Sequence, residues 1–395
     1  MAGSVIISGA RTPIGKLAGA LSGFTAMELG GIAIREALRR ASIGPELVDY
    51  VFMGQVLQAG QGQITARQAA VNAGISMSVP ASTINKVCLS GLNAIQLADM
   101  LIATGQAEVV VAGGMESMSK APYLIPHARE GYRIGDGAIV DSMMFDGLTC
   151  AFDHEAMGLA TDRYSQAAGL EREEQDIFAA SSHERAAAAT KAGILNEEIV
   201  PVEVPQRKGS PLLVDNDEGI RPETNPESLG KLRPAFMPNG TITAGNASQI
   251  SDGAAALVVM SRAKAEELGL VPLGEVVSYG QVSGPDTSLL EQPSNAILRA
   301  LHSADLSVNE LDLVEINEAF AAVGVASTKA LGISADMVNV NGGAIALGHP
   351  IGASGARLAL TLLYELRRRG GGGLGAAALC GGGGQGDALV VRSLS

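Results

Sequence analysis

Residues 85–91 read Asn-Lys-Val-Cys-Leu-Ser-Gly, and the chain around this stretch decides the fold. Apolar residues recur after it at helical spacing, namely Leu92, Ile95, Ala98, Leu101 and Ile102. The pattern predicts a helix that begins just after Cys88 and runs to about Thr104, with Gly105 as its cap. Residues 108–114, Glu-Val-Val-Val-Ala-Gly-Gly, then predict a strand that is buried on both faces.

The later part of the chain repeats this order. Residues 33–38 fall on residues 296–301 at a spacing of 263, and Ser90-Gly91 falls on Ser354-Gly355 at a spacing of 264. A second apolar helix and an apolar strand through residues 376–379 follow the second Ser-Gly. We interpret the repeat as an internal duplication. It predicts two α/β halves with mostly parallel sheets, related by a pseudo-twofold axis.

Residues 120–249 have no counterpart in either half. They are richer in charge, Pro and Met, and they predict an amphipathic helix over residues 173–191 and a loop over residues 205–239. We expect this segment to be an insertion that covers the active site. The expected domains are an N-terminal half of residues 1–119 plus 250–271, the insertion of residues 120–249, and a C-terminal half of residues 272–395.

The composition favours close packing of helices on a sheet. The 395 residues are 47% hydrophobic but only 3% aromatic, with 50 glycines and no Trp. A formal charge of −13 argues against a general nucleic-acid binder or a binder of anionic membranes. An anionic ligand would therefore need a local basic patch, although each candidate is equally well explained as a solvated surface charge. The candidates are Arg207, Lys208, Arg221, Lys231 and Arg233.

The cysteines and the termini indicate the compartment. Cysteines at 88, 150 and 380 form neither a disulfide framework nor a metal-binding cluster, so we expect a reducing compartment and no metal site. The N-terminus has no signal-peptide pattern, and no apolar run reaches transmembrane length. Ser393-Leu394-Ser395 is a poor peroxisomal address. The expected location is the cytoplasm.

Cys88 is the first candidate for chemistry. At a helix N-terminus the backbone N–H groups and the helix dipole favour an anion, which predicts a lowered thiol pKa and a nucleophile. The alternative is a buried cysteine that acts as a small hydrophobic residue. His349 lies five residues before the second Ser-Gly, so the pseudo-twofold axis would bring it to Cys88. The positive end of its helix would keep His349 neutral, as a general base must be.

Three further stretches attract attention. Asn317 directly follows an apolar strand over residues 313–316, where α/β proteins place functional side chains, although a turn former is an equal alternative. The glycines of residues 341–350, Asn-Gly-Gly-Ala-Ile-Ala-Leu-Gly-His-Pro, would let the backbone approach a ligand. The Gly381–Gly384 run after Cys380 offers backbone N–H groups that suit an oxyanion.

These motifs, taken together, resemble the thiolase family over essentially the whole chain. The motifs are Asn-Lys-Val-Cys-Leu-Ser-Gly at 85, Asn-Glu-Ala-Phe at 317, Gly-His-Pro at 348 and Cys-Gly-Gly-Gly at 380. The resemblance implies duplicated α/β halves in α-β-α-β-α layers, an inserted loop domain, and acyl-CoA and CoA as substrates. It also implies a homo-oligomer, either a dimer or a tetramer.

The resemblance further implies a role for each motif. Cys88 would take the acyl group as a thioester while His349 accepts the thiol proton. Cys380 would remove the α-proton of a second acetyl-CoA. His349, with Asn317 acting through a water, would hold the enolate, and the backbone N–H groups of Cys88 and Gly382 would hold the tetrahedral intermediate. The candidate substrate-binding residues are Ser248, Met157, Phe236, Phe320, Arg221 and Ala319.

Two departures from the family pattern concern the substrate. Many short-chain members carry His where this chain has Ala156, and glycine is frequent at the position of Gln249. We expect condensation of two acetyl-CoA to acetoacetyl-CoA, an acetyl-CoA C-acetyltransferase activity in lipid metabolism that needs no metal or redox cofactor. The alternatives are a longer-chain 3-ketoacyl-CoA thiolase, a decarboxylative ketoacyl synthase, and a non-catalytic acyl-CoA-binding subunit.

Overall fold

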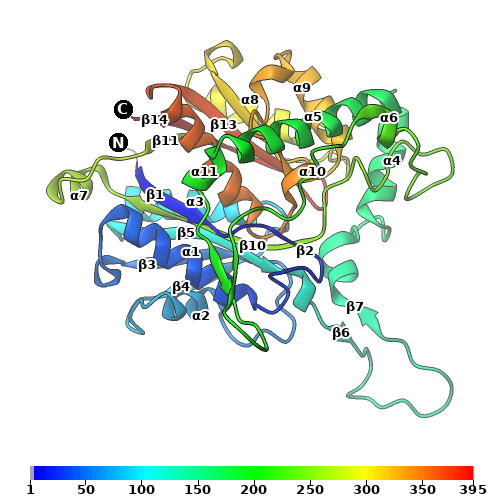
Figure 1. The fold of residues 1–395 in the computed structure, drawn as a ribbon, viewed down its shortest axis with the longest axis horizontal. Coiled ribbons are helices and arrows are strands. Elements are labelled where there is room, and N and C mark those ends of the chain that lie inside the picture. Colours follow the sequence, from blue (N-terminus) through cyan, green and yellow to red (C-terminus); the bar gives the residue numbers. More distant parts are fainter. Residues whose placement is uncertain (1–3, 395) are drawn as a thin grey trace.

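A computed structural model describes residues 4–394 and contains a 10-stranded sheet (Figure 1). The strand order is β12-β13-β14-β11-β1-β10-β5-β3-β4, and β2 pairs with β10. The strands are β1 (Val5–Arg11), β2 (Gly15–Lys16), β3 (Tyr50–Gly54), β4 (Ala81–Ile84), β5 (Val109–Ser117), β10 (Ser251–Met260), β11 (Gly274–Ser283), β12 (Leu313–Ile316), β13 (Leu374–Gly381) and β14 (Gln385–Ser393).

The sheet consists of two halves with the same strand order. The N-terminal half reads β4-β3-β5-β10-β1 and the C-terminal half reads β12-β13-β14-β11, with a parallel bridge from Val314 to Val338 at the place that β4 fills in the first half. The two halves meet where β1 pairs with β11. This shared order confirms the duplication.

The prediction of mostly parallel sheets is wrong. The pairs β3–β4, β3–β5 and β12–β13 are parallel, whereas β1–β10, β5–β10, β13–β14 and β11–β14 are antiparallel. The reason is clearest in the second half, because only a short glycine turn joins β13 to β14 and such a connection returns the chain antiparallel.

Helices form three layers around the two halves of the sheet. The outer face of the N-terminal half packs against α1 (Ala26–Ala41) and α2 (Thr65–Asn72), and the outer face of the C-terminal half packs against α8 (Gln292–Ser303). Between the halves lie α3 (Ser90–Ala103) and α11 (Ser354–Arg368), whose residues share one core with strands of both halves (Figure 1). The α-β-α-β-α layering is thereby confirmed.

The repeated Ser-Gly explains how closely α3 and α11 approach. A Cβ on Gly91 would lie 2.8 Å from the backbone N of Ala356, and a Cβ on Gly355 would lie 2.3 Å from the backbone N of Leu92. The two contacts are pseudo-twofold mates, since Gly91 and Leu92 correspond to Gly355 and Ala356. Glycine at both positions therefore lets the two helix N-termini meet at the axis.

The segment between β5 and β10 carries its own small elements. They are β6 (Tyr123–Leu124), β7 (Val140–Asp141), α4 (Met157–Ala167), α5 (Arg172–Lys191), β8 (Val202–Val204), β9 (Leu212–Val214) and α6 (Pro226–Leu229). The helix predicted over residues 173–191 is α5. The chain between β6 and β7 extends away from the body of the molecule at the lower right of Figure 1. Short helices elsewhere are α7 (Arg262–Glu267), α9 (Ala321–Leu331) and α10 (Ala344–Leu347).

A buried cation ties this segment to the central sheet. Arg11, at the end of β1, is 1% exposed and forms ion pairs with Glu198 and Asp217 at 2.7 Å each. Both carboxylates come from the segment between α5 and α6, so its position relative to the sheet is fixed at this point.

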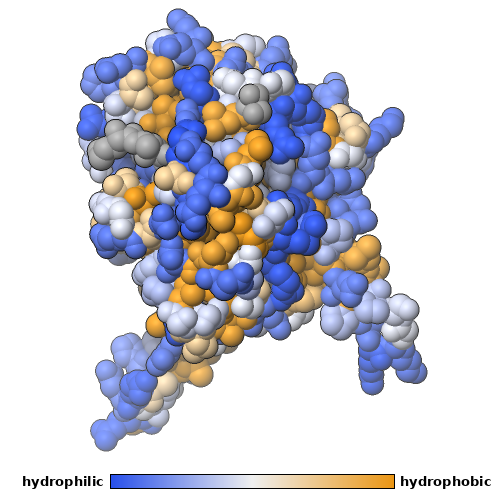
Figure 2. Space-filling view, turned by 90° about the vertical axis from the view of Figure 1, so that its left-hand side faces the viewer, coloured by the Kyte–Doolittle hydropathy of each residue, from blue (hydrophilic) through white to orange (hydrophobic). Residues whose placement is uncertain are grey.

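Two observations concern membranes and partner proteins. Among residues 4–394, none of the helices combines the length and the apolar character needed to cross a membrane. Figure 2 shows an apolar band (orange) between polar areas, on the face that lies at the left of Figure 1.

Candidate active site

Cys88 sits in a strained approach to α3. Val87, the residue before it, has φ +51°, which a β-branched residue adopts only when its surroundings force it. Two side chains hold this turn, since the backbone N of Val87 donates to Oδ1 of Asn85 at 3.1 Å and the backbone N of Lys86 donates to Oγ of Ser90 at 2.8 Å. Because α3 begins at Ser90, the predicted place of Cys88 at a helix N-terminus is confirmed.

His349 reaches Cys88 from the other half of the chain. It follows α10 and Gly348, whose φ is +113° and where a Cβ would lie 2.4 Å from Oγ of Ser251. The Nε2 atom of His349 lies 3.4 Å from Sγ of Cys88, and its Nδ1 atom lies 2.6 Å from Oγ of Ser354. The structure thus brings together the nucleophile and base predicted from the repeat.

Ser354 assigns the protons of the imidazole ring. We assign its hydroxyl proton to the carbonyl oxygen of Pro350, 3.0 Å away, which makes the Ser354 oxygen the acceptor of the Nδ1–H of His349 at 2.6 Å. The Nε2 atom is then unprotonated and faces the thiol of Cys88 as an acceptor. This is the tautomer that a general base needs.

Asn317 and Cys380 complete the cluster. Asn317 follows β12, is fully buried, and places Nδ2 3.4 Å from Nε2 of His349; its Oδ1 has no hydrogen-bond partner among residues 4–394. Cys380 lies in β13, is 1% exposed, and is close enough to Cys88 for the two thiols to affect each other electrostatically. Gly382 lies in the turn between β13 and β14, and a Cβ on it would lie 3.5 Å from the side chain of Val87, the residue before Cys88. The five residues predicted to be catalytic therefore converge on one place.

The prediction of a lowered pKa for Cys88 is wrong. Burial raises the pKa of its thiol to about 12, and the nearby carboxylate of Glu116 acts in the same direction. Being 4% exposed, Cys88 loses more by leaving water than its thiolate gains from the helix end. For Cys380, burial and the neighbouring Cys88 likewise raise the pKa.

The prediction of a neutral His349 is confirmed, with a different cause. Burial lowers the pKa of His349 to about 3, and the positive charge of Arg357 adds to the effect. The resting site is therefore a neutral thiol beside a neutral imidazole. A thiolate forms only when Cys88 passes its proton to Nε2.

His349 is part of the lining of a largely apolar cavity of about 250 Å³. Four of the predicted substrate-binding residues line it, namely Met157, Phe236, Ser248 and Phe320. Phe236 and Phe320 meet edge to face with ring centroids 6.3 Å apart. A second cavity of about 630 Å³ shares Met157 as a wall and also reaches Val87 and Gly382.

Two predicted substrate-binding residues do not line either cavity. Ala319 is 7% exposed, and its carbonyl oxygen accepts from the backbone N of Ser248 at 3.0 Å, so it supports Ser248 instead. Arg221 is exposed, and its backbone N donates to Nδ1 of His183 at 3.1 Å. The remaining basic candidates, Arg207, Lys208, Lys231 and Arg233, are also exposed and line neither cavity.

The two departures from the family pattern both face the smaller cavity. Ala156 and Gln249 are part of its lining. The Gln249 side chain donates to the carbonyl oxygens of Gly219 at 3.1 Å and Ile345 at 2.9 Å. Its amide thus ties the covering segment to α10.

Gly342 and Gly343, two of the glycines predicted to let the backbone approach a ligand, pack against protein atoms. A Cβ on Gly342 would lie 2.6 Å from Cβ of Ala186 in α5, and a Cβ on Gly343 would lie 2.2 Å from Cδ of Glu318. These glycines make room for a covering helix and a buried carboxylate. The next residue in the chain, Ala344, begins α10.

Sequence reasoning missed Ser354 and Glu116, although the repeat contains a signal for both. At the spacing of 264, Ser90 corresponds to Ser354 and Glu116 corresponds to Cys380. Glu116 is fully buried and accepts from the backbone N atoms of Val56 (3.0 Å), Leu57 (3.1 Å) and Gly352 (3.0 Å). Gly352 is the counterpart of Cys88. The pseudo-symmetric place thus holds a structural carboxylate where the active end holds a thiol.

No group of three or more His, Cys, Asp or Glu side chains within residues 4–394 gathers in a way that could hold a metal ion. The three cysteines, Cys88, Cys150 and Cys380, are free and buried.

Comparison with known proteins agrees with this geometry. Residues 4–263 match the model of the thiolase N-terminal domain, and residues 270–393 match that of the thiolase C-terminal domain. A probable acetyl-CoA acetyltransferase of Mycolicibacterium smegmatis is 57% identical over 388 residues, covering 98% of this chain and 100% of the relative.

Two more distant relatives match with similar coverage. The acetyl-CoA acetyltransferase of Cupriavidus necator is 51% identical over 366 residues, which is 92% of this chain and 93% of that protein. A probable acetyl-CoA acyltransferase of Staphylococcus epidermidis is 49% identical over 363 residues and covers 92% of both chains. On these matches and on the arrangement of its two halves, the chain belongs to the thiolase family.

Proposed function

We propose that this chain is an acetyl-CoA C-acetyltransferase, which condenses two acetyl-CoA into acetoacetyl-CoA and CoA and also runs in reverse. The observation that carries the proposal is the Cys88 thiol, 3.4 Å from an unprotonated nitrogen of an imidazole that lines an apolar cavity. The names of three relatives support the acyl transfer, and two of these specify the acetyl group.

The first half of the proposed reaction acetylates Cys88. Its sulfur attacks the thioester carbonyl of acetyl-CoA while Nε2 of His349 takes the thiol proton. The carbonyl oxygen becomes an oxyanion, for which the backbone N–H groups of Cys88 and Gly382 are the proposed donors. The oxyanion then re-forms the carbonyl as the bond to CoA breaks, and His349 passes its proton to the CoA sulfur, so that CoA leaves as a thiol.

The second half forms the carbon–carbon bond. Cys380 passes its proton to His349, and the resulting thiolate takes an α-proton from a second acetyl-CoA. The protonated Nε2 of His349 and a water held by Asn317 stabilise the enolate oxygen. The carbanion attacks the acetyl carbonyl carbon on Cys88, and the Cys88 sulfur leaves and regains its proton from His349. The thiols and the imidazole end in their starting states.

No metal or redox cofactor enters this proposal, because no electron is transferred to or from an outside acceptor. The raised pKa values of both thiols fit a scheme in which one proton moves among three groups. A buried pair that is neutral at rest avoids holding a charge in the low-dielectric interior.

A longer-chain 3-ketoacyl-CoA thiolase is the second candidate. The cavity of about 630 Å³ beyond Met157 favours it, since a longer acyl group could extend there if Met157 moved. The same candidate would give Ala156 a role in widening the acyl site.

Thiolysis by free CoA distinguishes the two candidates. Acetoacetyl-CoA is compared with a 3-ketoacyl-CoA of about twice its acyl length or more, in the parent and in Met157→Ala, which removes the shared wall. Efficient cleavage of only the short substrate by the parent, with gain of the long one in Met157→Ala, supports the acetyl assignment. Preference of the parent for the long substrate would move the assignment to the second candidate.

We further propose that the enzyme is a cytoplasmic homo-oligomer, a dimer or a tetramer, acting in lipid metabolism. Three buried free cysteines are compatible with a reducing compartment. The apolar band in Figure 2 is the kind of surface at which copies associate. Light scattering coupled to size-exclusion chromatography measures the mass; a monomer at micromolar concentration would contradict the oligomer.

A further inference from the structure

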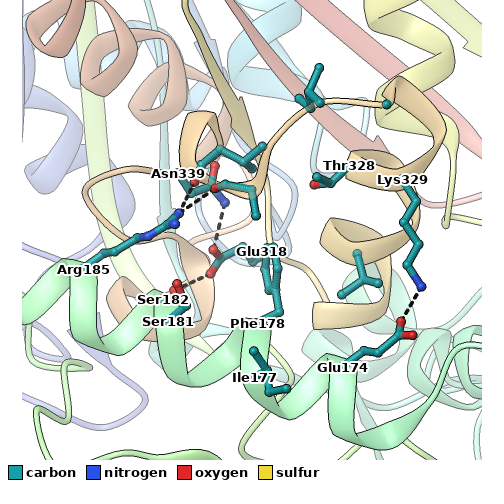
Figure 3. Close-up of a pocket in the computed structure, with 15 residues that line it drawn as sticks. Glu174, Ile177, Phe178, Ser181, Ser182, Arg185, Glu318, Thr328, Lys329 and Asn339 are labelled. Atoms are coloured by element: carbon teal, nitrogen blue, oxygen red, sulfur yellow. Dashed lines mark hydrogen bonds and ion pairs between the residues drawn. The ribbon is translucent and has the colours of Figure 1, made fainter.

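Glu318 stands beside Asn317 but points the other way. Side chains of adjacent residues at a strand end turn to opposite sides, so Asn317 faces His349 while Glu318 leaves the active site. The Glu318 carboxylate is 1% exposed and lies at the floor of a cavity of about 440 Å³ between α5 and α9 (Figure 3). The mechanism above does not use it.

The cations of this cavity already have partners. Lys329 forms an ion pair with Glu174 at 2.5 Å, and Arg185 donates to the backbone oxygen of Ala335 at 3.0 Å (Figure 3). Lys329 and Arg185 are therefore bound within the protein and do not by themselves indicate a ligand. The informative group is the buried acid at the floor.

Three segments of the chain converge on Glu318. Its carboxylate accepts from Oγ of Ser182 at 2.6 Å, from Nδ2 of Asn339 at 2.8 Å and from the backbone N of Ile345 at 3.0 Å. Ser182 belongs to α5 of the covering segment, and Ile345 belongs to α10, four residues before His349. Burial raises the pKa of Glu318, and the hydrogen bonds from Ser182, Asn339 and Ile345 act against that rise. All three partners are donors, so the carboxylate form, which only accepts, satisfies them best.

The partners of Glu318 also hold the backbone beside Asn317. The Asn339 side chain donates to the backbone O of Ile316 at 2.8 Å and accepts from its backbone N at 2.8 Å. Ser182 accepts from the backbone N of Gly343 at 3.0 Å. Since only glycine at 343 leaves room for the carboxyl group, the packing around Glu318 is closed on this side as well.

We propose that Glu318 is a positioning residue, which as a carboxylate locks the Asn317 strand end to the α10–His349 segment and to α5, and so fixes Asn317 against Nε2 of His349. The inference rests on the proposed thiolase reaction. Its target is the 3.4 Å contact between Asn317 and His349, which serves the condensation step. Acetylation of Cys88, as proposed above, does not use Asn317.

The test is a double-mutant cycle with Glu318→Gln and Asn317→Ala. Glu318→Gln keeps the volume but turns an NH₂ group toward one of the three donors. We expect it to lower kcat for thiolysis of acetoacetyl-CoA about 10- to 100-fold, as a small misplacement of a catalytic group does, with KM changed less than about threefold. CoA release on Cys88 acetylation should fall less than condensation.

The cycle separates positioning from a general structural role. Because Glu318 acts through Asn317, the double variant should lose much less than the product of the two single losses. Glu198→Gln is the matched control: Glu198 is a 2% exposed carboxylate that binds Arg11 and Thr361, away from the catalytic cluster. It should lower the unfolding temperature while leaving kcat within about twofold of the parent.

The outcomes distinguish the role of Glu318 from the proposed function. Losses that multiply in the double variant, with Asn317→Ala impaired, would overturn the role of Glu318 and leave the proposed function standing. Parent-like turnover of Asn317→Ala would overturn the roles of both Asn317 and Glu318 and leave the proposed activity standing, whereas a parent enzyme that does not cleave acetoacetyl-CoA would overturn the proposed activity itself. If Glu318→Gln did not fold, Ser182→Ala removes one of the three donors; a smaller loss with the same non-additivity is expected, and multiplied losses would again overturn the role.

Discussion

Ser354 offers the sharpest test of how the active-site base is prepared. Its Oγ lies 2.6 Å from Nδ1 of His349 and donates to the backbone O of Pro350, which fixes the tautomer with a bare Nε2. In Ser354→Ala the buried Nδ1–H loses its acceptor. The competing tautomer carries its proton on Nε2 and cannot accept the proton of Cys88.

The size of the effect follows from that lost hydrogen bond. Leaving a buried donor unsatisfied costs about 1 to 3 kcal/mol. If the whole difference disfavours the productive tautomer, kcat falls about 5- to 150-fold, at about 1.4 kcal/mol for each factor of ten. Ser354 does not line the cavity that His349 lines, so KM for acetoacetyl-CoA should stay within about threefold of the parent.

Two rates are measured. Thiolysis of acetoacetyl-CoA is monitored through the loss of its enolate absorbance, and the accessibility of the thiolate is monitored through the rate at which iodoacetamide alkylates Cys88. Both rates should fall in parallel. Ser327→Ala is the control, because Ser327, in α9, is fully buried and donates to the backbone O of Leu290 at 2.8 Å. A Ser354→Ala variant with kcat within about twofold of the parent would refute the tautomer argument.

Three further predictions concern the thiol, the helix crossing and the buried cation. Because burial raises the pKa of Cys88 to about 12, its thiolate fraction grows with pH, and its alkylation rate should rise from about pH 7 to about pH 9 without a plateau. The rate is measured on the Cys88 peptide by mass spectrometry. A plateau below about pH 8 would contradict the raised pKa. Gly355→Ala places a Cβ 2.3 Å from the backbone N of Leu92, so the free energy of unfolding, measured by urea denaturation, should fall by about 1 to 3 kcal/mol or more. Gly23→Ala is the control and should change it little, because no atom lies within 4 Å of the added Cβ. Equal effects of the two variants would refute the close crossing of α3 and α11. Arg11→Met leaves the carboxylates of Glu198 and Asp217 buried without their cation and should lower the free energy of unfolding by about 3 to 5 kcal/mol, and a loss below about 1 kcal/mol would argue against a tightly buried pair.

Much of the fold could be predicted because local patterns and the repeat agree. The helical spacing after Cys88 predicts α3, and the second Ser-Gly predicts α11. The duplication then places Cys88 and His349 at one axis, which the 3.4 Å contact confirms. Strand direction could not be predicted in the same way, because it depends on connection length, and the insertion before β10 hides the hairpin-like return that β13 and β14 make.

The electrostatics of the site depends on packing that a local sequence pattern does not contain. The helix-end argument for Cys88 considers one helix, whereas the burial that raises its pKa comes from both halves of the chain. The same holds for Glu116 and Glu318, whose hydrogen-bond partners come from distant segments. The prediction for Arg221 rests on its charge alone, and charge does not indicate which side of a loop faces a cavity.

The most direct test of the account is to find where the acetyl group resides. The Cys380→Ser variant is incubated with acetyl-CoA, digested, and examined by mass spectrometry, with Cys88→Ala as the control. We expect acetyl on Cys88 with release of CoA and little acetoacetyl-CoA, and no acetyl-enzyme in Cys88→Ala. Acetylation of another residue, or unchanged acetoacetyl-CoA formation by Cys380→Ser, would contradict the division of labour between the two thiols.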